Sequence, residues 1–273
     1  NFTPLHTGLS NGVKNSFSNG FMFSLIIMFP VLVKFGPLTI YSYGVALAVA
    51  VFIALSLLLN EAKTQGYDKD SILDLGMVLV VSSIVGARLL YIALNIPFFI
   101  EHPEEIIMLH HGGLAILGGF LTGIASVYIF TRKKKLSFLK IADLLVPFIA
   151  LAHTIGRIGC FFNGCCYGIP SRYGFYFPVH NAVLIPTQLI SSFLLLVLYV
   201  VLRIQQRRTH SAGSIFAAYI ILYSALRFLV EFIRFDSPKS FFGLTIFQLF
   251  CIVFFIAGVF FAFRLKWKNK SLL

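Results

Sequence analysis

Charged residues are scarce in this sequence, and their scarcity excludes an ordinary water-soluble domain. Asp, Glu, Lys and Arg make up 12% of the 273 residues, whereas hydrophobic residues make up 58%. A soluble domain carries roughly a quarter charged residues. The composition therefore predicts a protein whose surface lies largely in lipid.

Regular alternation of apolar and polar residues is also lacking, which excludes a membrane-spanning β-barrel. Several apolar runs reach about 20 residues, the length at which a helix crosses the hydrocarbon core with its backbone hydrogen bonds satisfied internally. We therefore expect an all-α, polytopic membrane protein with about seven transmembrane helices. The expected spans lie near residues 40–60, 71–95, 113–131, 139–161, 187–203, 213–233 and 245–263.

Acidic residues are few, with 10 Asp and Glu against 22 Lys and Arg. This excess of positive charge does not indicate a nucleic-acid partner, because the basic residues gather in segments on one side of the expected helices. The largest clusters lie within 132–135, 203–208 and 264–270. By the positive-inside rule, we expect the N-terminus outside and the C-terminus in the cytoplasm.

The first 27 residues differ from the rest of the chain. The apolar run 21–29 is too short to span a membrane, and it lacks the basic front end and small-residue cleavage site of a signal peptide. We expect a polar or interfacial extension over residues 1–27 and a single seven-helix transmembrane domain over residues 28–273.

Arginines occur inside the expected spans, at positions 88, 157 and 227, and Arg234 lies at the end of one span. A charge at the centre of a membrane costs at least ~2.5–3.5 kcal/mol, so such residues face a cavity, a partner or an anionic ligand. A structural role is open, because Arg227 and Glu231 are four residues apart and can pair. Several arginines with few acids favour a bound anion such as a lipid phosphate, which a guanidinium can hold through two hydrogen bonds.

Three segments carry most of the polar and small residues of the spans. Tyr223, Arg227 and Glu231 recur every four residues and share one helix face, with Arg234 three residues further on. The segments 156–168 and 110–119 are rich in glycine, which permits close backbone approach. The expected topology brings all three near the outer leaflet.

Together these segments resemble the prolipoprotein diacylglyceryl transferase family, over a match that runs from about Met28 to the C-terminus. The motifs are Gly112-Gly113, Gly118-Gly119, Gly-Arg-x-Gly at 156–159 and Tyr223-x3-Arg227-x3-Glu231. Supporting matches are Gly86-Ala87-Arg88-Leu89, Pro186-Thr187-Gln188, and Leu244-Thr245 with Gln248.

The resemblance implies an enzyme that moves the diacylglyceryl group of phosphatidylglycerol onto the lipobox cysteine of a preprolipoprotein. The reaction forms a thioether and releases glycerol phosphate. It further implies a multi-pass protein of the bacterial inner membrane with its active site toward the outer leaflet. The implied partners are phosphatidylglycerol and the signal peptide that carries the lipobox cysteine.

The resemblance also implies roles for individual residues. Arg157 would hold the lipid phosphate, and Arg227, oriented by Glu231, would stabilise the leaving group or the acceptor thiolate. Tyr223 would complete the catalytic set. The other expected substrate-binding residues are Tyr43, Arg88, Gly112, Gly113, Gly118, Gly119, Asn163, Gly168 and Arg234.

The chain departs from the usual pattern of this family at several positions. Cys160 and Cys165 stand where Asn and Glu are usual, and Leu117 stands where His or Tyr is common. Nothing in the sequence selects a replacement for a missing catalytic base. The candidates are His110, His111 and His153.

The cysteines leave three interpretations open. Cys160, Cys165 and Cys166 can serve as small packing residues, or Cys160 can form a disulfide with one of the adjacent pair. With His153 they could also form a metal or redox centre, although the usual C-x2-C spacing is missing. No motif implies a cofactor, and we assign no metal on this basis.

Other functions compete with the transferase. A diverged or inactive paralogue would keep the arginines and act on another acceptor or on none. A thiol-redox membrane protein would depend on Cys160 and Cys165 more than on Arg157 and Arg227. A transporter would place polar residues along a whole transmembrane path, whereas here they gather toward one face.

Overall fold

The structure is a computed structural model that describes residues 28–36, 38–108, 112–235, 237 and 243–270. The extension expected over residues 1–27 lies outside the described residues. The single domain expected over residues 28–273 stays a prediction.

Seven long helices form the body of the molecule, and each overlaps an expected span, with α8 running seven residues past the expected end at 263. They are α1 (Ser42–Thr64), α2 (Lys69–Leu94), α4 (Ile116–Lys133), α5 (Phe138–Phe162), α6 (Thr187–Gln206), α7 (Ser214–Glu231) and α8 (Ile246–Lys270). The short elements α3 (Ile96–Glu101) and η1 (Pro103–Ile106) lie between α2 and α4. The helical membrane fold is therefore confirmed.

Six of these seven helices are long and apolar enough to cross a membrane, within the described part of the chain. The exception is α4, which has 18 residues and ends in Arg132 and Lys133. Its apolar part is therefore shorter than that of its neighbours. Glycines let it lie directly against α2: a Cβ on Gly118 would come 2.2 Å from the carbonyl oxygen of Gly86.

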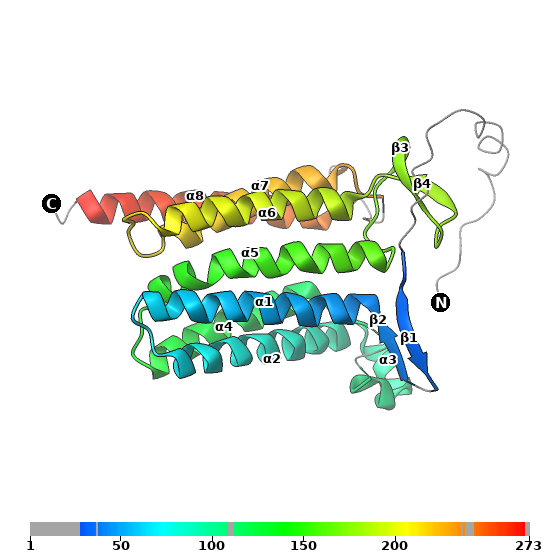
Figure 1. Cartoon of the computed structure of the whole chain (residues 1–273), viewed down its shortest axis with the longest axis horizontal. Coiled ribbons are helices and arrows are strands. Elements are labelled where there is room, and N and C mark those ends of the chain that lie inside the picture. The colour runs from blue at the N-terminus through cyan, green and yellow to red at the C-terminus, as the bar shows by residue number, and fades with distance from the viewer. Residues whose placement is uncertain (1–27, 37, 109–111, 236, 238–242, 271–273) are drawn as a thin grey trace.

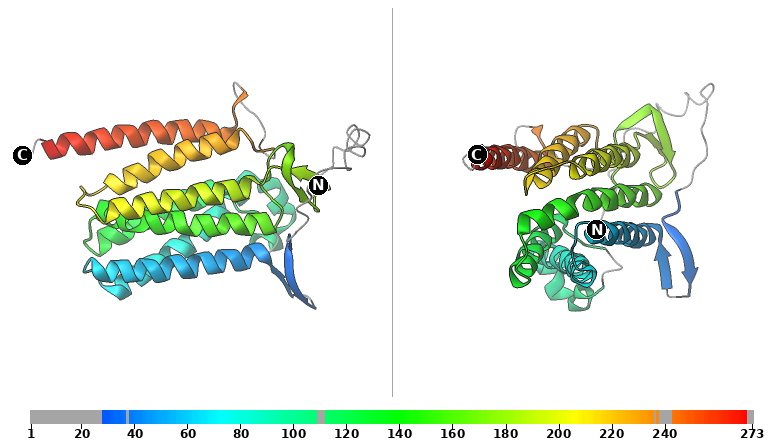
Figure 2. Two further views of the ribbon diagram at one scale, coloured as in Figure 1. Left: turned by 45° about the horizontal axis from the view of Figure 1, so that its top comes forward. Right: turned by 60° about the vertical axis from the view of Figure 1, so that its left-hand side comes forward.

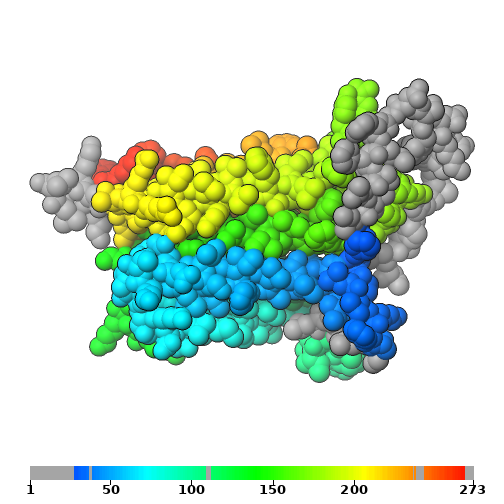
Figure 3. Space-filling view, in the orientation of Figure 1, coloured from blue at the N-terminus to red at the C-terminus, as the bar shows by residue number. Residues whose placement is uncertain are grey.

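Helix α5 occupies the centre of the bundle, with α1, α2 and α4 on one side and α6, α7 and α8 on the other (Figures 1 and 2). In the most apolar 18-residue stretch of α5, 61% is buried, whereas the corresponding share is 17–33% in the other five candidate spans. On the face shown in the space-filling view, α5 appears as a band between α1 and α6 (Figure 3). A polar residue on α5 is thus shielded from lipid, which is where an intramembrane arginine can be tolerated.

Two antiparallel hairpins lie at one end of the bundle (Figure 1). One pairs β1 (Val31–Phe35) with β2 (Leu38–Tyr41), and the other pairs β3 (Pro170–Phe177) with β4 (Ala182–Leu184). The turns after α1, α4 and α6, which contain the basic clusters, lie at the opposite end (Figure 1). The expected separation of charge between the two ends is therefore present, and which end faces the cytoplasm stays a prediction.

A buried carboxylate joins the two halves at the basic end. Asp143 of α5 accepts hydrogen bonds from the backbone N–H of Gly213 at 2.6 Å and of Phe216 at 2.7 Å. These donors belong to the first turn of α7, whose N–H groups have no partners within the helix. Asp143 therefore fixes the start of α7 against α5.

Candidate active site

A small cavity lies among α5, α6 and α7, toward the end that bears the hairpins. Arg157 stands in the last two turns of α5, Ser191 in the first two turns of α6, and Arg227 in the last two turns of α7. The walls of the cavity combine these polar groups with apolar side chains. The full lining is His153, Arg157, Ser191, Leu194, Leu195, Tyr223, Leu226, Arg227 and Val230.

Arg157 presents an incompletely bonded guanidinium to this cavity. Its side chain lies close to the Tyr223 hydroxyl, and both residues line the cavity. Among the described residues, the buried Nε of Arg157 has no hydrogen-bond partner. A buried donor left unpaired costs about 1–3 kcal/mol, so this atom is suited to an acceptor supplied by a ligand.

Arg227 is held by an ion-pair network on α7. Its Nη2 lies 2.5 Å from Oε2 of Glu231, whose side chain is fully buried. The same carboxylate oxygen lies 3.6 Å from Nη1 of Arg234, and the other accepts a hydrogen bond from the Thr245 hydroxyl at 3.1 Å. Glu231 thus orients both arginines and balances part of their charge.

Backbone pairing brings Arg234 to the loop that follows α5. Gly168 and Arg234 form an isolated antiparallel bridge. The N–H of Ile169 donates to the carbonyl of Ile233 at 3.0 Å. A Cβ on Gly168 would come 2.7 Å from that same carbonyl oxygen, so glycine is required for this approach.

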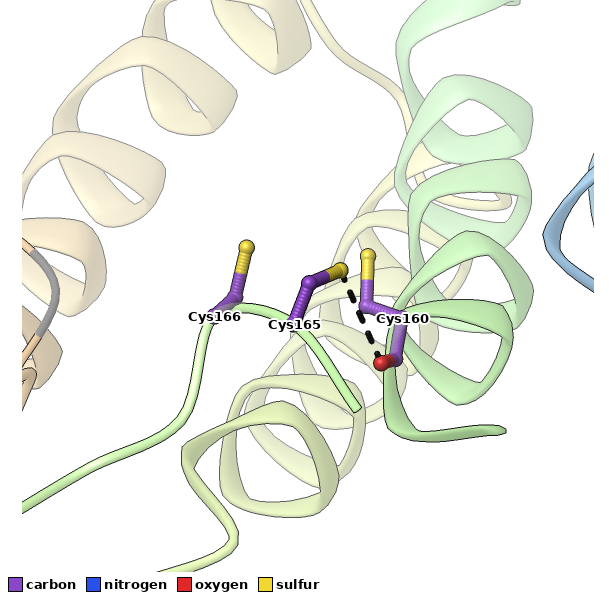
Figure 4. Close-up of side chains that lie close together, drawn as sticks. All are labelled: Cys160, Cys165 and Cys166. Atoms are coloured by element: carbon purple, nitrogen blue, oxygen red, sulfur yellow. Dashed lines mark hydrogen bonds between the residues drawn. The ribbon is translucent and has the colours of Figure 1, made fainter. Parts of the chain in front are cut away.

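Three cysteines cluster where α5 ends. Cys160 lies in its last turn, while Cys165 and Cys166 lie in the loop that follows. Their sulfur atoms all lie within 4.8 Å of one another and all three thiols are free. The Cys165 side chain points toward Cys160 (Figure 4). Hydrogen bonds from the other two thiols, and the nearby charges of Arg234 and Arg157, lower the pKa of the Cys166 thiol.

Tyr43 and Asn163 flank this cysteine cluster. Tyr43 lies at the start of α1, close enough to interact electrostatically with Arg157 and with each of the three sulfurs. Asn163 caps the C-terminal end of α5, close to the Cys165 thiol. The structure therefore brings Tyr43, Asn163, Gly168 and Arg234 to the cysteine loop, beside the cavity.

Arg88 lies elsewhere, between α2 and the segment after η1. Its guanidinium donates to the carbonyls of Ile106 at 3.1 Å, Gly112 at 2.6 Å and Gly113 at 2.9 Å. It also lies over the ring of Phe99 at 5.3 Å. These contacts give Arg88 a structural task, and its expected role in binding substrate stays a prediction.

The glycine pairs of the sequence motif also pack against α2. Gly112 and Gly113 have φ of +85° and +77°, which favours glycine. Gly118 and Gly119 approach carbonyl oxygens of α2. None of the four lines the cavity, and their predicted contact with substrate is untested.

Of the three histidine candidates, the structure describes His153. His153 lines the cavity, with its ring centroid 5.5 Å from that of Tyr223. It does not belong to the cysteine group whose ligand atoms lie within 4.8 Å, so it does not complete the metal set considered from the sequence. His110 and His111 lie outside the described residues.

Buried polar residues at the start of α6 support the cysteine loop, and sequence reasoning gave them no site role. Gln188 donates from Nε2 to the carbonyl of Cys165 at 2.6 Å, and the Thr187 hydroxyl donates to the carbonyl of Cys166 at 2.5 Å. Both are at most 1% exposed. The available signal was a pair of polar residues at the very start of an apolar span, after Pro186.

Comparison with known proteins finds related sequences over most of the chain. A family model described as prolipoprotein diacylglyceryl transferase matches residues 30–264. A phosphatidylglycerol–prolipoprotein diacylglyceryl transferase of Clostridium tetani is 36% identical over 240 residues, which cover 85% of this chain and 96% of that protein. Proteins of the same name from Clostridium novyi and Thermosynechococcus vestitus are 34% and 35% identical, and cover 89% and 88% of this chain and 98% and 93% of those proteins.

Proposed function

The chain belongs to the prolipoprotein diacylglyceryl transferase family, and we propose that it transfers the diacylglyceryl group of phosphatidylglycerol to the lipobox cysteine of a preprolipoprotein. The product is a thioether-linked diacylglyceryl protein, and glycerol phosphate is released. The observation that carries this proposal is the unpaired, buried Nε of Arg157 at the wall of the cavity.

The cavity suits the head of a phospholipid. Arg157 supplies N–H groups for phosphate oxygens, and a guanidinium binds phosphate in a bidentate fashion. Leu194, Leu195 and Leu226 supply an apolar wall for the glyceryl carbons. The acyl chains then extend along helices whose outer faces already carry exposed apolar side chains, such as Phe193 of α6.

Arg227 is placed to stabilise the charge that develops on the leaving group. As the acceptor thiolate forms a bond to the glyceryl carbon, the carbon–oxygen bond to phosphate breaks and its electron pair stays on the phosphate oxygen. Fixed positive charge in a site that excludes water stabilises this change effectively. Glu231 positions Arg227. Tyr223, which lies on the same helix as Arg227, contacts Arg157 of α5.

The membrane orientation forms part of the proposal. Most of the basic segments lie at the end opposite the cavity, and cytoplasmic ends of membrane proteins are rich in Lys and Arg. The cavity then opens toward the outer leaflet of the bacterial inner membrane. A secreted preprolipoprotein presents its lipobox cysteine at that leaflet.

Product formation in vesicles tests the function. The full chain is reconstituted with phosphatidylglycerol and a lipobox peptide, and the thioether-linked product is measured by mass spectrometry. Arg157→Ala is expected to lower the rate about a hundredfold or more, because the phosphate loses its donors. The matched control is Arg172→Ala, an exposed arginine on β3.

Two results would contradict the proposal. One is a folded wild-type chain that binds phosphatidylglycerol and yields no product. The other is a folded Arg157→Ala chain that is as active as the Arg172→Ala control.

A further inference from the structure

The cysteine cluster is the feature that the proposed reaction leaves unexplained. Cys160, Cys165 and Cys166 place three sulfur atoms within 4.8 Å of one another, and among the described residues this is the group whose ligand atoms are arranged to hold a metal ion. Packing alone does not require three thiols to converge. A disulfide would use two of them and leave the third without a partner.

The spacing of the sulfurs suits a tetrahedral ion. With Zn–S bonds of about 2.3 Å, two thiolates on one zinc lie about 3.8 Å apart. The three sulfurs lie within 4.8 Å of one another, no more than about 1 Å above this spacing. Thiolates are the ligands that select soft and borderline ions such as Zn²⁺ over hard cations.

Hydrogen bonds hold the backbone of the cysteine cluster in place before any ion binds. Buried Gln188 and Thr187 hold the carbonyls of Cys165 and Cys166, and the N–H of Cys165 donates to the carbonyl of Cys160 at 3.2 Å. Cys166 has φ of +62°, a left-handed conformation that is unusual for a residue with a Cβ. Strained conformations held by their surroundings occur at functional sites, and supporting hydrogen bonds of this kind orient metal ligands.

The Cys165 side chain points toward Cys160, and the Cys160 and Cys166 side chains lie on either side of it (Figure 4). Cys160 follows Arg157 by three residues on α5 and therefore shares a helix face with it. Arg234 and Arg157 both act electrostatically on the Cys166 sulfur. Positive charge beside the cluster offsets the charge of three thiolates.

We propose that Cys160, Cys165 and Cys166 bind one Zn²⁺ through three thiolates, and that the acceptor cysteine of the lipobox occupies the fourth position. Catalytic zinc sites have three protein ligands and an open fourth position. A thiol that binds zinc loses its proton, and the thiolate is the nucleophilic form. The identity of the fourth ligand rests on the proposed function, whereas the three-thiolate site does not.

The transfer step balances without an oxidant or reductant. The acceptor thiol releases its proton to water when it binds Zn²⁺. Its sulfur then forms a bond to the glyceryl carbon, the carbon–oxygen bond to phosphate breaks, and glycerol phosphate leaves with the electron pair. The thioether product no longer carries a negative charge on sulfur and dissociates from the ion.

The metal content of the purified full chain tests the three-thiolate site. We expect elemental mass spectrometry to find about one zinc ion per chain. That zinc should be lost in Cys160→Ser, Cys165→Ser and Cys166→Ser. Cys251→Ser is the matched control, because Cys251 is buried in α8 and lies outside the cluster. Equal zinc in wild type and in the triple variant would overturn the site. So would a disulfide within the cluster in protein whose thiols are alkylated at cell lysis.

Cobalt spectroscopy on the wild-type chain does not depend on the folding of any variant. Co²⁺ bound by three thiolates is expected to give a thiolate-to-metal charge-transfer band and visible bands of a tetrahedral ion. A lipobox peptide with cysteine should change these bands, whereas the same peptide with serine should not. An identical response to both peptides would overturn the assignment of the fourth ligand.

Failure of this proposal is distinguishable from failure of the transferase function. Arg157→Ala is expected to keep its zinc and lose product formation. Product formation by a chain that holds no zinc would overturn the zinc site and leave the function standing. A zinc-loaded, folded wild-type chain that forms no product would overturn the function and leave the three-thiolate site standing.

Discussion

At the scale of single residues, the buried carboxylate of Glu231 lies against more than one arginine of the site. That carboxylate contacts Arg227 at 2.5 Å, Arg234 at 3.6 Å and the Thr245 hydroxyl at 3.1 Å. A buried charge that loses its partner is strongly unfavourable. The position of the Arg227 guanidinium therefore depends on a residue that need not touch the substrate.

Glu231→Gln tests this dependence. We expect kcat to fall about tenfold to a hundredfold, because small displacements of a catalytic group have effects of that size. The KM for phosphatidylglycerol should change less, since Arg157 remains. Steady-state kinetics in vesicles of varied phosphatidylglycerol content separate the two constants.

Glu61→Gln is the matched control for this change. Glu61 pairs with Arg203 at 2.7 Å, at the end of the bundle opposite the cavity. An equal loss of kcat in both variants would show a general effect on folding and would contradict the orienting role of Glu231.

The intramembrane arginines show how far residue-level prediction reaches. The cost of a charge in lipid identified Arg88, Arg157 and Arg227 as residues with special partners. This cost does not reveal that the partners of Arg88 are the backbone carbonyls of Ile106, Gly112 and Gly113, because a backbone acceptor has no signature in the sequence. Thr187 and Gln188 were missed for a related reason, since they bond to the backbone of the cysteine loop and not to a ligand.

At the scale of helices, Asp143 connects α5 to the start of α7. It is 3% exposed and accepts two backbone hydrogen bonds from a helix 70 residues further along the chain. Asp143→Asn replaces one acceptor with a donor that faces a backbone N–H. We expect this change to lower the free energy of unfolding by about 1–3 kcal/mol.

Thermal unfolding in detergent measures this effect, with Asp74→Asn as the control. Asp74 is an exposed residue on α2, so its replacement should leave the melting temperature nearly unchanged. Equal melting temperatures for the two variants would contradict the proposed connection between α5 and α7.

The contact between α2 and α4 yields a second prediction at this scale. A Cβ at Gly118 would lie 2.2 Å from the carbonyl oxygen of Gly86 and 2.6 Å from Cβ of Leu90. We expect Gly118→Ala to destabilise the protein by about 1–3 kcal/mol, the usual effect of overpacking. Gly44→Ala is the control because a Cβ there meets no atom within 4 Å, and a melting temperature for Gly118→Ala at or above that of Gly44→Ala would refute the close contact.

The helices themselves were predictable because lipid leaves the backbone few alternatives. Runs of about 20 apolar residues had to become helices, and all seven expected spans did. It was harder to predict from the sequence which helices pack against one another. The central place of α5 depends on contacts with α1 and α6, and its sequence differs from theirs mainly in carrying Asp143 and Arg157 within an apolar helix.

At the scale of the whole molecule, the two ends of the bundle differ in chemistry. One end bears the hairpins and the cavity, and the other bears the turns rich in Lys and Arg (Figure 1). The positive-inside rule orients such a molecule with its basic end in the cytoplasm. On this rule we propose that the cavity end faces the secretory side.

Thiol labelling in intact cells measures this orientation. In a chain whose four natural cysteines are replaced by serine, Tyr173→Cys on β3 should react with a membrane-impermeant maleimide. Lys134→Cys, in the turn between α4 and α5, should react only after the cells are permeabilised. The reverse pattern would invert the proposed topology.

The position of the cavity among three helices that border lipid has a kinetic consequence. A phospholipid arrives by diffusing within the plane of the bilayer, so the quantity that governs turnover is its mole fraction in the membrane and not its concentration in bulk water. The lipidated product leaves into the same plane and competes there with fresh substrate. The enzyme's throughput is thus linked to membrane composition, and a cell that alters its headgroup ratio changes the rate of lipoprotein maturation without altering a single residue of this chain.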